Sequence, residues 1–185
     1  PPVSNLWRFN EMGFDFVAIS GGKALRGPQS AGLLMGKKDL IKAARLSMPP
    51  RGKTIGRGMK VNKEEILGML VAVEEFVKID HDAEALIFLE RIKKIQAAAD
   101  SVPGVTTKIS TPVLGNVTPT LNMSFDYSKI GKTGEQLRLD LRNGSPSIES
   151  VGGKDNIGMT AWSLQEGEDV IVAKRLKEVL EAAVK

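Results

Sequence analysis

Two long stretches of helical hydrophobic repeat follow one another in the middle of the chain and divide it into two parts. Asn62-Lys63-Glu64-Glu65 places Glu three residues after an N-cap residue, which is typical of a helix start, and apolar residues continue at helical spacing to Val77. A second helix is predicted from Asp82, with apolar residues on one face at Leu86, Leu89, Ile92 and Ala99. Because only residues 79–82 separate the two helices, they are predicted to connect an N-terminal part to a C-terminal part.

The C-terminal part has the pattern of an α+β domain. Strands are predicted over 105–109, 117–125, 147–151 and 158–163, and helices over 133–143 and 167–184. Thr133 followed by Gln136 resembles a capping box at the start of the first of these helices. We therefore predict that residues 64–185 form a compact unit, with an antiparallel sheet and helices on one side of it.

The N-terminal part is too small to bury a core of its own. An apolar run over 15–20, ended by two glycines, predicts a buried strand, and a second run over 31–35 predicts a strand beside it. A helix over 38–47 and a loop over 48–61 rich in Gly, Pro and basic residues follow. Since the chain also begins without Met, we expect it to be the C-terminal part of a longer protein.

The scarce residue types exclude several kinds of chemistry. Without Cys there are no disulfides, thiolate metal sites or Cys nucleophiles, and His81 alone builds neither a metal centre nor a catalytic triad. We expect no metal, and we expect His81 to be a solvated residue at a helix junction. Acids and bases must come from Lys, Asp, Glu, Tyr127 or a cofactor. No apolar run is long enough to span a bilayer and no targeting segment is recognised, so a cytoplasmic protein without membrane contact is expected.

Positive charge is concentrated in one segment. The whole chain carries a net +4, but residues 37–63 alone hold nine Lys or Arg and one acid, Asp39. Such a segment suggests a single anionic partner, and the alternative is a solvated helix face followed by a lysine-rich loop. A non-enzymatic RNA-binding module is a further alternative, although the segment has no aromatic residue to stack on bases.

The loop after the first strand is the best candidate for chemistry. Ser20-Gly21-Gly22-Lys23 places a hydroxyl, two glycines and a lysine at the end of a predicted strand. A nucleoside-triphosphate P-loop does not fit, since no Gly lies six residues before Lys23 and Ala24 stands where Ser or Thr is required. Pyridoxal phosphate chemistry fits better, because it uses a lysine for the Schiff base and a nearby hydroxyl for the phosphate. The alternative is a glycine-rich turn that ends in a solvent-exposed lysine.

Two motifs carry a family resemblance. Residues 20–41 resemble the cofactor-lysine segment of the selenocysteine synthase (L-seryl-tRNA(Sec) selenium transferase) family. Residues 55–68, with Ile55-Gly-Arg-Gly-Met-Lys, resemble the shorter relatives in that family, which include D-glucosaminate-6-phosphate ammonia-lyase, and residues 1–6 fit the same branch. The resemblance is dense over residues 1–76 and thin over 77–185.

The resemblance implies a fold-type-I pyridoxal-phosphate enzyme. Residues 1–60 would be the end of the large, cofactor-binding domain, 61–80 a connecting helix and 81–185 the small α+β domain. Lys23 would be the catalytic, Schiff-base lysine. The other implied contacts are Ser20, Gly22 and Gln29 to the cofactor and Arg26, Arg57 and Lys60 to the substrate. The family's aspartate that pairs with the pyridine nitrogen would precede Pro1, so this chain alone is expected to be inactive.

The resemblance also implies the reaction and the partners. We expect elimination at Cα–Cβ of a β-hydroxy or β-oxy amino acid, such as a phosphorylated amino sugar acid, in a homodimer or larger homo-oligomer. The implied substrate is small, anionic and of amino-acid type. Selenium transfer to seryl-tRNA stays open as an alternative, because the loop around Lys23 is equally similar to both branches.

Overall fold

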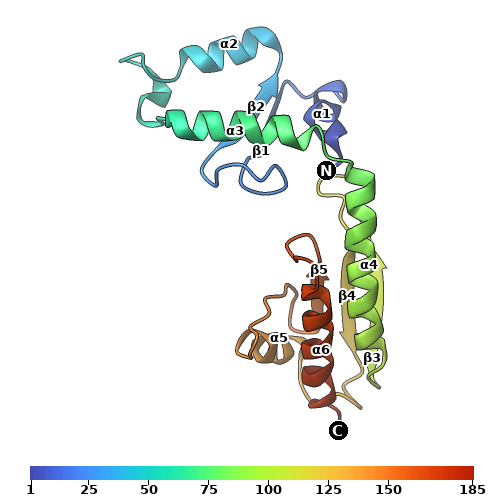
Figure 1. The fold of residues 1–185 in the computed structure, drawn as a ribbon. Coiled ribbons are helices and arrows are strands. Elements are labelled where there is room, and N and C mark those ends of the chain that lie inside the picture. Colours follow the sequence, from blue (N-terminus) through green and yellow to red (C-terminus); the bar gives the residue numbers. More distant parts are fainter. The chain divides into compact units, whose positions relative to one another are not determined.

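The computed structural model describes residues 1–185, which divide into two compact units, Pro1–His81 and Asp82–Lys185. Each unit has its own cluster of buried apolar side chains. Figure 1 shows the course of the chain through both units.

A two-stranded antiparallel sheet and one helix form the centre of the N-terminal unit. The strands are β1 (Phe16–Ser20) and β2 (Gly32–Gly36), paired so that Ala18 lies opposite Leu34, and the helix is α3 (Lys63–Phe76). The remaining elements are η1 (Val3–Leu6), α1 (Arg8–Glu11), α2 (Lys38–Leu46) and η2 (Ile55–Gly58). The strands and the helix over 38–47 were predicted, whereas the short helices η1 and α1 were not.

Helix α3 belongs to this N-terminal unit. Its Met69 and Phe76 form a small buried cluster with Leu25, against which Ile19 and Leu33 of the sheet pack. The prediction of one compact unit over 64–185 is therefore wrong at its start, since the contact boundary lies between His81 and Asp82. The hydrophobic periodicity of the sequence predicts the helix, but it does not show that the apolar face packs on the sheet of the N-terminal unit.

Strand β1 is less buried than its apolar sequence predicts. Phe16 is 44% exposed and Leu34 on β2 is 50% exposed, whereas Val17 and Ile19 are half-buried. One face of the two-stranded sheet therefore presents apolar side chains to the surface of this unit. An apolar sequence predicts a strand that is buried on both faces, but it does not show whether a second layer of structure covers the sheet.

The C-terminal unit is a three-stranded antiparallel sheet with helices on one side, as predicted. The strands β3 (Val105–Ser110), β4 (Thr120–Phe125) and β5 (Asn156–Thr160) pair in the order β3-β4-β5. The helices are α4 (His81–Asp100), α5 (Gly134–Arg142) and α6 (Glu168–Glu181). Leu121 and Met123 of β4 point into one core with residues of all three helices, whereas Asn122 and Ser124 alternate with them on the other face. The fully buried helical residues of that core include Ile92, Ile95, Ala99, Leu137, Leu141, Leu176 and Leu180.

Three strand predictions in this unit need correction, and the first, over 117–125, is observed only as Thr120–Phe125. Residues 147–151 are not a strand: only Val151 pairs, with Gly158, and the N–H of Ile148 donates to the last turn of α5 at Leu141 O. The predicted strand over 158–163 is observed as Asn156–Thr160, because the chain turns where Leu164 N donates to Ala161 O.

His81 is packed at the junction between α3 and α4, not solvated as expected. It is half-buried, its Nε2 lies 2.9 Å from the backbone O of Phe76, and the two rings lie 4.4 Å apart between centroids. The contact with the Phe76 ring explains the burial of His81, and no local pattern in the sequence indicates it. None of the helices combines the length and the apolar character needed to cross a membrane.

Candidate active site

The candidate loop leaves β1 at Ser20 and returns to β2 at Ala31. Its base is closed by two backbone hydrogen bonds of 2.9 Å, from Gly21 N to Ala31 O and from Gly27 N to Gly21 O. At its tip, Arg26 N donates to Lys23 O over 2.9 Å, which forms a tight turn. The loop is therefore an ordered turn with fixed ends, and Figure 1 shows it between β1 and β2.

The turn has both a side chain that is buried in the core of the unit and side chains that are exposed to solvent. Leu25 is only 4% exposed and inserts into the small core, whereas Lys23 and Arg26 are exposed. Arg26 has φ +56°, a left-handed conformation that costs free energy for a residue with a side chain. Burial of Leu25 beside it holds the turn and presents both cationic side chains at the surface of the loop.

The two glycines are required by contacts within the chain. A Cβ on Gly21 would lie 2.4 Å from Sδ of Met69 and 2.7 Å from Ala31 O, and one on Gly22 would lie 2.4 Å from Oε1 of Gln29. The structure shows that these glycines make room for α3 and for Gln29, so their first effect is on the shape of the loop.

The predicted site residues fall into two groups. Ser20, Gly22, Lys23, Arg26 and Gln29 lie together in the loop after β1. Arg57 lies in η2, and Lys60 follows that element by two residues. No hydrogen bond or ion pair joins Arg57 or Lys60 to the loop, but Val61, next to Lys60, lines one cavity with Ser30 and Ala31 at the end of the loop.

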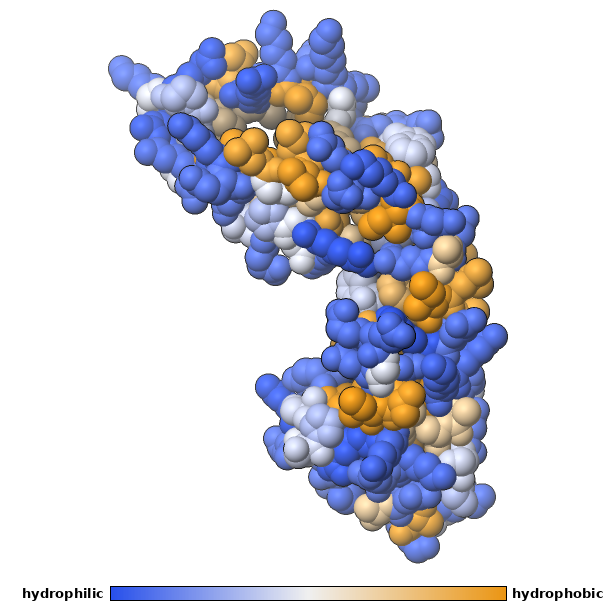
Figure 2. All heavy atoms as spheres, viewed as in Figure 1, coloured by the Kyte–Doolittle hydropathy of each residue, from blue (hydrophilic) through white to orange (hydrophobic).

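Of the cations in the basic segment, residues 37–63, only Lys37 forms an ion pair. Lys37 forms an ion pair of 2.5 Å with Asp15, which raises the pKa of its ammonium group. The other cations of the segment form no ion pair; they are Lys38, Lys42, Arg45, Arg51, Lys53, Arg57, Lys60 and Lys63. Figure 2 shows hydrophilic side chains projecting from this part of the unit, with apolar side chains gathered near them. The charge of the segment is thus available to an anion.

Sequence analysis missed the residues of α3 that contact the loop. Met69 lies against Gly21 and Gly27, Gly68 lies against the ring of Pro28, and Glu65 accepts a hydrogen bond from the hydroxyl of Ser30. These residues recur at helical spacing, but the sequence does not say which face of α3 meets the loop. The same hydrogen bond, with one from the backbone N–H of Asn62, lowers the pKa of Glu65.

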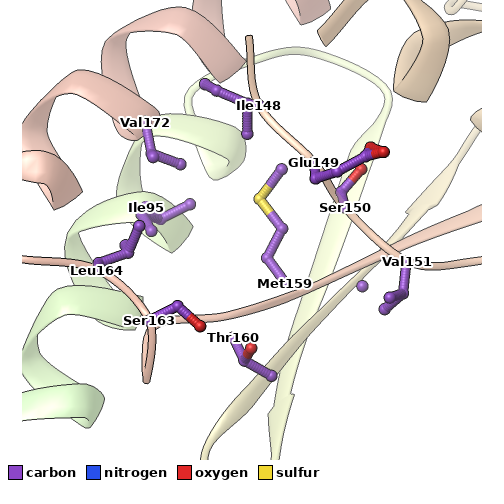
Figure 3. Close-up of a pocket in the computed structure, with 11 residues that line it drawn as sticks. Ile95, Ile148, Glu149, Ser150, Val151, Met159, Thr160, Ser163, Leu164 and Val172 are labelled. Carbon is purple, nitrogen blue, oxygen red and sulfur yellow. The ribbon is translucent and has the colours of Figure 1, made fainter. Parts of the chain in front are cut away.

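Both units contain cavities that Lys23 does not line. One, of about 370 Å³, lies between β2 and α3 and is lined mostly by aliphatic residues, with Ser30 and Glu65 at its edge. Another, of about 490 Å³, lies in the C-terminal unit beside β5 and is shown in Figure 3. In the close-up, Ile95, Ile148, Leu164 and Val172 lie to one side of Met159, and Glu149 and Ser150 lie to the other. The other polar residues of the lining are Thr160 and Ser163. Neither cavity is lined by a lysine, so neither supplies an amine for covalent chemistry.

Comparison with known proteins extends the sequence evidence. No family model matches the chain. Over 179 residues, 95% of the chain, it is 32% identical to 5'-C-glycyluridine monooxygenase-decarboxylase from a Streptomyces species, and it covers 43% of that protein. Over 176 residues, 92% of the chain, it is 26% identical to D-glucosaminate-6-phosphate ammonia lyase from Salmonella typhimurium, and it covers 45% of that protein. The predicted family resemblance is confirmed.

The ammonia-lyase relationship is also visible in the fold. A solved structure of D-glucosaminate-6-phosphate ammonia-lyase matches with a TM-score of 0.69 and 23% identity, over 94% of this chain and 45% of the other. This match confirms the fold prediction, a mixed α/β arrangement that ends in a small α+β unit. The chain spans less than half the length of the curated relatives that it matches. Both relatives are enzymes, and the similarity covers nearly all of this chain.

Proposed function

We propose that this protein is a pyridoxal-phosphate-dependent enzyme that acts on a small anionic substrate of amino-acid type, with Lys23 as the catalytic lysine. The observation that carries the proposal is the ordered loop after Ser20, with its turn from Lys23 to Arg26, which presents a hydroxyl and an amine and is held by Leu25. Similarity to two enzymes over more than nine-tenths of the chain supports it.

The donor set of the loop fits the cofactor. Pyridoxal phosphate has an aldehyde, which a lysine amine can attack, and a dianionic phosphate, which hydroxyl and cationic groups bind. Residues 20–30 offer Ser20, Lys23 and Arg26 and contain no acidic residue. In the proposed arrangement Ser20, Gly22 and Gln29 contact the cofactor, and Lys23 is its point of covalent attachment.

In the proposed reaction, the cofactor and the residues of the chain have different tasks. When bound, the cofactor withdraws electrons from the Cα of an amino-acid substrate. The amine of Lys23 would act as the base that takes the proton from Cα of the substrate. Arg26, in the same loop, is placed to bind the anionic group of the substrate. Arg57 and Lys60, in the basic segment, are proposed for the same task.

The reaction that we favour is elimination at Cα–Cβ of a β-oxy amino acid, as in an ammonia-lyase. The name of the Salmonella relative supports this reaction. Loss of the proton from Cα and of the β-oxygen substituent would give an enamine, and hydrolysis of its imine tautomer by water would give a keto acid and ammonia. Selenium transfer to seryl-tRNA and a non-enzymatic RNA-binding role have no support from the relatives found. A homodimer or larger assembly remains part of the proposal.

A second candidate reaction is favoured by the other relative. The Streptomyces protein is the more similar of the two, at 32% identity, and its name describes oxygen-dependent decarboxylation of a glycyl nucleoside. Such a reaction breaks the bond from Cα to the carboxylate instead of a bond at Cβ.

One set of assays separates the candidates. The intact protein is mixed with pyridoxal phosphate, and the visible absorption band of the bound cofactor is recorded. D-Glucosaminate-6-phosphate and 5'-C-glycyluridine are then added separately, and ammonia, carbon dioxide and consumed oxygen are measured. Ammonia from the first substrate supports the lyase, and carbon dioxide with oxygen uptake from the second supports the alternative. Absence of the absorption band at saturating cofactor would refute the proposed function.

A further inference from the structure

We infer that Met69 and Glu65 of α3 are positioning residues that hold the loop of Lys23 in its turn. The inference rests on the proposed function for what the loop binds, but not for the contacts that hold it. Neither residue is a catalytic residue in this account, because each contacts the ends of the loop and not Lys23.

Met69 supports both ends of the turn at once. Its side chain is only 5% exposed, and its Sδ lies 2.4 Å from the Cβ position of Gly21 and 3.1 Å from that of Gly27. These glycines are the pair joined by the hydrogen bond from Gly27 N to Gly21 O. A flexible thioether fills the irregular space beside such a closed turn. Loss of the thioether would therefore loosen the base of the loop from which Lys23 projects.

Glu65 ties the other end of the loop to the start of the helix. Its Oε1 accepts from the hydroxyl of Ser30, and its Oε2 accepts from the backbone N–H of Asn62 over 3.2 Å. One carboxylate thus joins the last residues of the loop to the N-cap of α3. The same two hydrogen bonds keep Glu65 ionised to lower pH than an ordinary glutamate, because they lower its pKa.

The contacts lie on one face of α3. Glu65, Gly68, Met69 and Ala72 are spaced by three or four residues, which places them on the same side of the helix. A Cβ on Gly68 would lie 2.9 Å from the Pro28 ring, and the Ala72 Cβ lies 3.1 Å from the Cβ position of Gly27. This face therefore contacts the loop from Gly21 to Ser30 on both sides of its exposed tip. The tip keeps Lys23 and Arg26 outward while its two ends are fixed.

Amide hydrogen exchange of the intact protein without cofactor tests the contacts directly. The amides of Gly21, Gly27 and Ala31 are hydrogen-bonded within the loop, over 2.9, 2.9 and 3.1 Å. In Met69→Ala these amides should exchange at least about tenfold faster than in the unmodified protein, and Met69→Leu should restore most of the protection. Leu67→Ala is the matched control, because Leu67 lies on the same helix and is 62% exposed. Glu65→Gln should accelerate Ala31 selectively, with Glu64→Gln as its control.

Cofactor binding gives the second readout. Met69→Ala should weaken the apparent Kd for pyridoxal phosphate and reduce borohydride-trapped label on Lys23 at subsaturating cofactor, while Leu67→Ala should do neither. Equal exchange of the loop amides in Met69→Ala and Leu67→Ala would overturn the inference, even if Met69→Ala lowered the melting temperature. If Met69→Ala does not fold, the exchange rate of the Ala31 amide is compared between Glu65→Gln and Glu64→Gln, and equal rates would overturn the inference. Failure of the unmodified protein to bind the cofactor would refute the proposed function and leave the exchange result standing.

Discussion

Asp169, in the first turn of α6, forms an ion pair of 2.8 Å with Lys94 of α4, and the aspartate side chain is almost completely buried while the lysine remains largely exposed. The pair joins two of the helices that cover the sheet of the C-terminal unit. The hydrogen bond from Lys94 lowers the pKa of the Asp169 carboxyl, against the effect of burial, which raises it. Asp169 is therefore ionised in the folded protein and depends on Lys94 for its charge partner.

Removal of that partner should destabilise the C-terminal unit. Lys94→Met leaves a buried carboxylate with only backbone donors near it, and we expect the free energy of unfolding to fall by about 1–3 kcal/mol. Lys93→Met, at an exposed neighbour without an ion pair, should change it by less than about 0.5 kcal/mol. Denaturant unfolding of the two variants measures the difference, and equal values would show that the ion pair contributes no net stability.

The same pair predicts a pH dependence with a definite sign. The folded-state pKa of Asp169 lies below the ordinary pKa of an aspartate, so its stabilising effect is complete above that ordinary pKa and is lost as the pH falls through the folded pKa. The stability difference between the unmodified protein and Asp169→Asn should therefore be constant near neutral pH and shrink below about pH 4. Unfolding curves of both proteins between about pH 3 and pH 7 test this, and a difference that grows on acidification would contradict it.

Gly21 should tolerate no side chain. In Gly21→Ala the new Cβ would meet Sδ of Met69 and the backbone oxygen of Ala31, and the second of these cannot move without opening the loop. We expect a loss of about 1–3 kcal/mol in unfolding free energy. Gly52→Ala is the control, because nothing lies within 4 Å of its Cβ position. Thermal unfolding of the N-terminal unit should separate the two variants clearly.

Thr133 should contribute to stability as a helix cap. Its hydroxyl accepts from Gln136 N over 3.3 Å, and its own N–H donates to Oε1 of Gln136 over 2.9 Å. Thr133→Ala removes the first of these hydrogen bonds and should lower the unfolding free energy by about 1 kcal/mol, whereas Thr133→Ser should retain most of it. An effect of Thr133→Ser as large as that of Thr133→Ala would mean that the lost methyl group, not the hydrogen bond, is responsible.

Arg57 should affect substrate use more than stability if the substrate assignment is right. Arg57→Lys keeps the charge but loses the planar fork that binds a carboxylate or phosphate through two hydrogen bonds. In the active, cofactor-loaded protein we expect a raised KM or lowered kcat/KM with little change in Tm. Arg51→Lys, in the same basic segment, serves as the control. A lowered Tm with unchanged kinetics would make Arg57 a structural residue.

The sequence predicted helices and strands correctly where contacts between residues close in the sequence determine them. The helix starts at Lys63 and Gly134 follow from caps within four residues, and the strand pair β1–β2 follows from two apolar runs ended by glycine. Residues 147–151 were predicted as a strand because their composition suits one, but the N–H of Ile148 is taken by the end of α5. The conformation of residues 147–151 therefore depends on a tertiary contact with α5, and the periodicity of the sequence carries no information about that contact.

The candidate site shows the same division. Ser20, Lys23 and Arg26 could be grouped from the sequence, since they lie within seven residues of each other. The packing of Gly21 on Met69 and the hydrogen bond between Ser30 and Glu65 both depend on where α3 lies. Composition indicated a cationic surface but could not show which cations share a site.

Reductive trapping tests the central claim most directly. The intact protein is incubated with pyridoxal phosphate, reduced with borohydride and digested, and the modified peptides are mapped by mass spectrometry. The account predicts a phosphopyridoxyl group on Lys23, because its amine is exposed on the ordered turn beside Ser20. Label on Lys37 or Lys60 with none on Lys23 would contradict it.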